Sequence, residues 1–129
     1  SIDDNQFIDT LIDSNLLKQK NNDVVKQEIL LTILSVIDEN IENNFIDNRT
    51  LIDQRSMPSR YLLNKIKNSS KNHNLGELIL SINISLIEKK WSEVHPEHLR
   101  IILYALKNTY IEGIFKKVIL EILKESKII

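Results

Sequence analysis

Histidine and acidic side chains are the first candidates for chemistry in this chain. His95 and His98 flank Pro96 and Glu97, and Glu93 lies two residues before His95. Imidazole and carboxylate groups three residues apart on one helix face can hold a divalent metal ion. Because Pro96 suits the first position of a helix, His95 lies outside that helix and does not share its face with His98. We therefore predict no metal site and interpret these residues as polar groups at a helix start.

The sequence lacks the usual patterns of catalysis and cofactor binding. It contains no cysteine, no G-x-S-x-G elbow and no glycine-rich phosphate loop, and its only glycines are Gly76 and Gly113. Neighbouring carboxylates such as Asp3 and Asp4 could act as acid and base. Carboxylates are far commoner, however, on solvated helix faces and caps. We predict that the protein is not an enzyme and that it needs no cofactor.

Basic side chains gather in the C-terminal part of the chain. Residues 58–129 hold 12 basic and 7 acidic residues, net +5, whereas residues 1–57 hold 5 basic and 11 acidic residues, net −6. Such a cluster could neutralise phosphates, so a small helical regulator that binds nucleic acid is the alternative function. The pI near 6.3 and the interleaved glutamates favour a solvated face instead. The basic residues concerned are Arg100, Lys107, Lys116, Lys117 and Lys124.

Three aromatic residues complete the set of possible partner-binding residues. Trp91 lies between two predicted helices, and tryptophan is favoured at the energetic centres of interfaces. A tryptophan at such a position more often packs the turn from inside. Tyr104 and Tyr110 lie on and after the following helix. Both interpretations of Trp91 remain open from the sequence.

Apolar residues recur with helical periodicity along most of the chain. The clearest stripe runs from Ile111 to Leu123 at i, i+3, i+4, i+7, i+8, i+11 and i+12, which places it on one face of an α-helix. Leu80, Ile84 and Ile87 form a second apolar face on another helix, which predicts that this helix lies between neighbours. We expect an all-α fold of about six helices arranged as stacked antiparallel hairpins, either a short solenoid or an orthogonal bundle. The expected helices cover about 3–17, 23–39, 58–66, 75–90, 96–110 and 111–126, with 68–74 as a loop and one further turn at 49–54.

Length and composition predict a single domain, residues 1–129, made of an N-terminal helical pair (1–45) and two hairpins (58–126). No stretch has the roughly 18–20 apolar residues of a membrane-spanning helix. The acidic start lacks the features of a signal peptide, so cytoplasmic residence is the default, with export left open if the chain is a mature fragment. Isoleucine, asparagine and lysine abound and Ala105 is the single alanine, which indicates an A+T-rich genome. We therefore give the asparagines little functional weight.

The two C-terminal hairpins show internal similarity. Residues 62–69 match residues 102–109 at a shift of 40, and with a three-residue gap Gly76 meets Gly113. A helix pair that recurs every 35–45 residues is typical of helical solenoids, because one pair cannot bury both its faces. The segment 58–126 thus resembles helical-repeat proteins of the tetratricopeptide and HEAT-like kind, and residues 91–106 and 121–129 resemble the closing part of long bacterial proteins of this type.

This resemblance and the absence of a catalytic pattern point to the same function. We expect a non-catalytic module that binds another protein, or the rest of a longer parent chain, through a groove or an exposed helix face. The resemblance implies that the domain caps the C-terminal end of a longer solenoid. Neither the partner nor the oligomeric state follows from the sequence.

Overall fold

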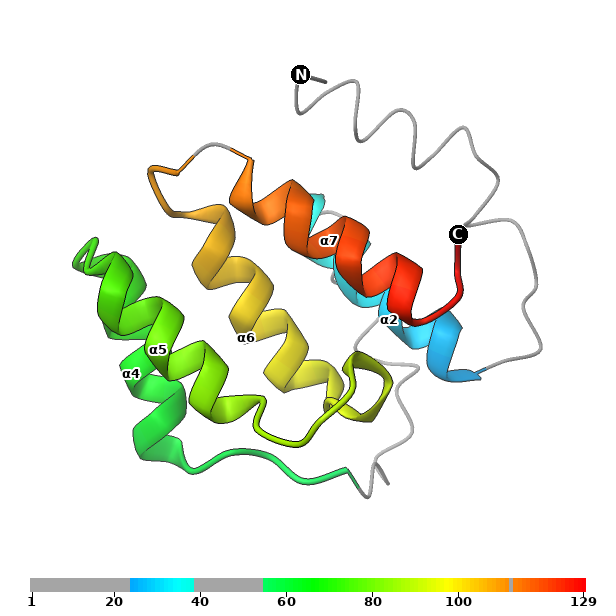
Figure 1. Cartoon of the computed structure of the whole chain (residues 1–129), viewed down its shortest axis with the longest axis horizontal. Helices are drawn as coiled ribbons and strands as arrows, with labels where there is room; N and C mark the ends of the chain where they lie inside the picture. Colours follow the sequence, from blue (N-terminus) through cyan, green and yellow to red (C-terminus); the bar gives the residue numbers. More distant parts are fainter. Residues whose placement is uncertain (1–23, 39–54, 112) are drawn as a thin grey trace.

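The computed structural model describes residues 24–38, 55–111 and 113–129, and they form an all-α structure (Figure 1). The predicted fold class is therefore confirmed. The predicted helix at 3–17 and the turn at 49–54 lie outside the described residues. Within them the helices are α2 (Val24–Ile37), α4 (Arg60–Lys71), α5 (Leu75–Ser85), the short 3-10 helix η2 (Trp91–Glu93), α6 (Pro96–Lys107) and α7 (Ile114–Glu125).

Helix α6 is the central element of the structure. Helix α4 packs on one side of it and α2 and α7 pack on the other, while α5 lies against α4 at the outside (Figure 1). Helix α6 thus has neighbouring helices on two sides. Apolar side chains from these helices meet in one core, which includes Ile33, Ile66, Leu99, Ile102 and Ile122.

Helices α4 and α6 cross at small residues. Ala105 is 5% exposed there, and the hydroxyl of Ser70 donates a hydrogen bond to its carbonyl oxygen at 2.7 Å. Side chains without γ-carbons let two backbones approach closely, and the serine hydroxyl can then reach across the contact. The only alanine of the chain thus lies where a direct hydrogen bond joins α4 and α6.

Side-chain caps set the starts of three helices. The hydroxyl of Ser59 accepts from the N–H of Leu62, and the carboxamide of Asn74 accepts from the N–H of Glu77, which satisfies N–H groups that have no partner inside the helix. Pro96 occupies the first turn of α6, as expected, and the His95 Nδ1 caps that helix by accepting from the N–H of Glu97.

Several predicted helix boundaries were wrong: α6 ends at Lys107 instead of residue 110, and α7 begins at Ile114 instead of residue 111. Helix α4 continues through Asn68 to Lys71, and it ends only where His73 adopts a left-handed conformation with φ of 58°. Helix α5 ends at Ser85 instead of Lys90, because a turn follows in which Glu88 has φ of 60°. Polar residues fill the last turn of α4, and apolar residues continue past the end of α5. Periodicity alone therefore misplaces both ends.

The C-terminus folds back onto the last helix. The N–H of Ile128 donates to the carbonyl of Leu123 at 2.9 Å, and the Ile128 side chain packs against the core, whereas Ile129 is exposed. In the part of the chain that the structure describes, no helix combines the length and the apolarity that crossing a membrane requires.

Candidate functional site

Trp91, which could have anchored a partner, lies in the core of the structure. Its side chain is 9% exposed, and its backbone N–H donates to the Glu125 carboxylate on α7 at 2.8 Å. The η2 turn therefore holds the indole beneath the end of the last helix. The indole surface of Trp91 that could contact a partner is therefore covered by the protein's own core.

The two predicted tyrosines remain at the surface. Tyr104 on α6 is 43% exposed and Tyr110, which follows α6, is 80% exposed. The Tyr110 ring lies against the His73 ring with 4.2 Å between the ring centroids. The turn between α4 and α5 and the turn after α6 are thus neighbours, although their residues are 37 positions apart.

The five predicted basic residues have different surroundings. Arg100 forms an ion pair with Glu97 at 3.9 Å, and the Lys107 ammonium donates to the carbonyl of Val36 at 2.7 Å. That contact satisfies a carbonyl at the C-terminal end of α2, where the helix dipole favours a cation. On α7, Lys116 is half-buried, and Lys117 and Lys124 are exposed.

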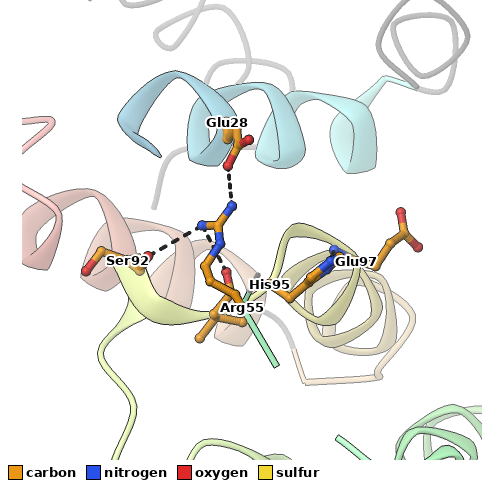
Figure 2. A network of polar contacts seen from close by, with 6 residues as sticks. Glu28, Arg55, Ser92, His95 and Glu97 are labelled. Atoms are coloured by element: carbon orange, nitrogen blue, oxygen red, sulfur yellow. Dashed lines mark hydrogen bonds and ion pairs between the residues drawn. The ribbon is translucent and has the colours of Figure 1, made fainter. Parts of the chain in front are cut away.

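The two histidines around Pro96 point in different directions. The His95 ring caps α6 from outside, as the close view of this region shows (Figure 2). The His98 ring is fully buried. Among residues 24–38, 55–111 and 113–129, no group of three histidine or acidic side chains is placed to hold a metal ion.

Arg55 joins three segments at a polar contact that the sequence analysis did not identify. Its guanidinium pairs with the Glu28 carboxylate on α2 and donates to the carbonyls of Ser92 and Val94, each at 3.5 Å (Figure 2). The Arg55 and Glu28 side chains are 21% and 24% exposed. A planar guanidinium suits this task because its N–H groups reach a carboxylate and carbonyls together. Ser92 and Val94 take part through their main-chain carbonyls, so we assign this contact to structure.

Ser85 and His98 form a buried hydrogen-bonded pair between α5 and α6. The Ser85 hydroxyl donates to the carbonyl of Ile82 at 2.7 Å, so it must accept from His98 Nε2, 2.9 Å away. The His98 Nε2 therefore carries the proton, and it cannot act as a base toward this serine. Burial, together with the electrostatic effect of Lys89 and His95 nearby, lowers the pKa of His98 from 6.5 to about 4. The pair thus keeps a neutral imidazole in the interior.

The second apolar face of α5 is open to solvent, which overturns the prediction that this helix lies between neighbours. Leu80, Ile84 and Ile87, here called the α5 stripe, are 61%, 47% and 63% exposed. The opposite face of the helix, with Leu78 and Ile82, packs inward. Leu80 and Ile84 lie one turn apart on α5, and Ile87 lies in the turn just after its end. Such a group marks an interaction surface more often than scattered single residues do.

A groove runs along the outside of α4 and ends at the first turn of α5. Its volume is about 290 Å³, and although its lining residues have polar side chains, apolar atoms make up the larger part of its lining surface. We call it the asparagine groove, and its lining residues are Tyr61, Asn64, Lys65, Asn68, Ser69, Asn72, Asn74 and Glu77. Sequence reasoning missed this groove because it discounted the asparagines as codon bias. The signal was present, since Asn64, Asn68 and Asn72 are spaced four residues apart.

No protein-family model, curated protein or solved structure matches this chain.

Proposed function

We propose that the protein is a non-catalytic interaction module that binds an amphipathic helix of another protein on the α5 stripe. The observation that carries this proposal is the exposure of Leu80 and Ile84 on α5 and of Ile87 in the turn that follows this helix. A partner helix presents apolar side chains at the spacing of Leu80 and Ile84, so the two sets can pack side by side. Each fully buried aliphatic side chain contributes about 1.5–3 kcal/mol to association before the costs of ordering.

Charge supports a partner helix with an acidic polar face. Residues 60–90 carry six lysines and arginines and two glutamates, net +4. One of those lysines, Lys65, is paired with Glu77. The other five cations lie on α4 or follow α5, and this net positive charge would favour an acidic helix as the partner.

A model peptide tests this proposal directly. The probe is a fluorescent 18-residue helix with leucines at i, i+3, i+4 and i+7 and glutamates elsewhere, titrated with the full chain by anisotropy. We expect micromolar binding that Leu80→Ser with Ile87→Ser weakens at least tenfold. Leu120→Ser, which changes a 40% exposed leucine on α7, is the matched control and should have no effect. Equal binding by all three proteins, or no binding at millimolar concentration, would refute the proposal.

The nucleic-acid alternative makes a different prediction. Phosphate binding would involve Lys116, Lys117 and Lys124 and would weaken steeply with added salt. It would persist in the Leu80→Ser, Ile87→Ser protein, because those changes remove no charge. Reversing the three lysine charges separates the alternatives, since only nucleic-acid binding should then be lost.

The place of the domain at the end of a helical-repeat protein also remains a proposal. It is supported by the α4–α5 and α6–α7 pairs, which follow each other along the chain. The paired glycines differ, however, because Gly76 is inside α5 and Gly113 precedes α7 with φ of 86°. Further helix pairs of similar period in the flanking coding sequence would support the repeat, and their absence would contradict it.

A further inference from the structure

The asparagine groove presents amide groups that the protein itself does not use. Within the described part of the chain, the side chains of Asn64, Asn68 and Asn72 make no hydrogen bond, and all three residues are exposed. Asn74, at the end of the groove, differs because its amide is occupied by the N–H and the carboxylate of Glu77. The three amides therefore each offer a donor and an acceptor to a ligand.

The spacing of these amides matches an extended polypeptide. Residues four apart on an α-helix are separated by about 6 Å along its axis. Alternate residues of an extended strand are separated by about 6.6–6.8 Å, and they point their N–H and C=O groups to the same side. Three amides spanning ~12 Å can therefore meet three alternate peptide units spanning ~13 Å. Each side-chain amide is complementary to one main-chain N–H and C=O.

The charge and shape of the groove favour the same ligand. Lys65 and Glu77 face each other across the groove at 3.7 Å, so the two charged groups of its lining offset each other. A neutral groove suits main-chain hydrogen bonds better than phosphates. Tyr61 is 74% exposed at one end of the groove, where its ring can cover a side chain of the ligand.

We propose that the asparagine groove binds an extended polypeptide segment through hydrogen bonds between its main chain and the amides of Asn64, Asn68 and Asn72. This site goes beyond the helix-binding function proposed above and does not depend on it, because the two surfaces use different residues. Recognition of a main chain is tolerant of sequence, so the ligand is defined by its extended conformation and by the absence of proline at the bonded positions.

Selection from a random 12-residue peptide library on the immobilised full chain tests the proposal. The best peptide is synthesised, and its Kd is measured for the wild type, for the triple variant Asn64→Ala, Asn68→Ala, Asn72→Ala, and for Asn83→Ala. Asn83 is an exposed asparagine of α5 outside the groove and is the matched control. We expect the triple variant to bind at least tenfold more weakly and Asn83→Ala to bind as the wild type does.

Methylation of alternate main-chain nitrogens of the peptide identifies the mode of binding. If the amides bind the main chain, methylation removes the donors and weakens binding at least tenfold. Selection of no peptide, or of a peptide that tolerates methylation or the triple variant, would overturn the proposal. So would a peptide whose binding is lost in the Leu80→Ser, Ile87→Ser protein, because it would then occupy the α5 stripe. Binding of oligo-dT in place of peptides would assign the groove to nucleic acid and would equally overturn it.

Discussion

His98 Nε2 lies 2.9 Å from the hydroxyl of Ser85, while its Nδ1 is buried without a hydrogen-bond partner among the described residues. A protonated ring would need a second acceptor at Nδ1, and the interior provides none there. The structure thus favours the neutral imidazole over the imidazolium. This relationship ties α5 to α6 and makes the stability of the fold depend on pH.

Stability should fall on acidification because of His98. Its pKa is lowered to about 4 in the folded protein, mainly by burial, from 6.5 in the unfolded chain. Between pH 4 and pH 6.5 the unfolded state binds a proton that the folded state does not. The free energy of unfolding is therefore at its full value above pH 6.5 and decreases as the pH falls toward 4. The shift corresponds to about 3 kcal/mol.

The measurement is urea unfolding at pH 7 and pH 4.5. We expect the wild type to lose about 2–3 kcal/mol more than His98→Leu over this interval. His73→Gln, which changes an exposed residue of the α4–α5 turn, should retain the wild-type pH dependence. An unchanged slope in His98→Leu would contradict the assignment.

Removing the Ser70 hydroxyl should destabilise the crossing of α4 and α6. The carbonyl of Ala105 lies in the last turn of α6, and the N–H of Thr109 donates to Leu106 instead of to it. Ser70→Ala therefore leaves a buried acceptor without its donor, at a cost of about 1–2 kcal/mol in chemical denaturation. Ser92→Ala removes an exposed hydroxyl and should change the unfolding free energy by less than about 0.5 kcal/mol. A similar effect of both substitutions would show that the hydrogen bond contributes nothing specific.

Breaking the pair of Arg55 and Glu28 should loosen the segment before α4. The pair is partly exposed, so its contribution lies between that of a surface and a buried ion pair, and we expect Arg55→Met to cost about 1–2 kcal/mol. A double-mutant cycle with Glu28→Gln should give a coupling of about 1 kcal/mol that decreases in high salt. Additive effects of the two substitutions would indicate that the carbonyls of Ser92 and Val94, not Glu28, are the important partners.

Alanine at the two glycines should have opposite effects. Gly113 has φ of 86°, a conformation that costs an L-residue about 1 kcal/mol, so Gly113→Ala should destabilise the protein by that amount. Gly76 lies inside α5, and an added Cβ there meets nothing within 4 Å. Gly76→Ala should therefore stabilise the protein by about 0.5–1 kcal/mol. Thermal melts of both variants check the signs, and destabilisation by Gly76→Ala would contradict the helical assignment of that residue.

The sequence by itself determined that the described chain is helical and where several helices start. Apolar residues at a period of 3.6 can all face one side only in a helix, so Ile119, Ile122 and Leu123 are buried together on α7. Ser59, Asn74 and Pro96 mark starts because capping depends on neighbours in sequence. Helix ends were less predictable, since they depend on backbone conformations at His73 and Glu88 that no side chain there favours.

Only the tertiary structure decided which faces are covered. The α5 stripe and the buried face of α5 are equally apolar in sequence, but α4 covers one and no described element covers the other. In the same way, Asn64, Asn68 and Asn72 line a groove because α5 turns back beside α4. Ser85 contacts His98 because this end of α5 lies next to α6. Periodicity specifies the local helical conformation. Which side chains are buried, and which hydrogen-bond partners they find, depends on contacts between residues distant in sequence, and the pattern of one segment carries no information about these contacts.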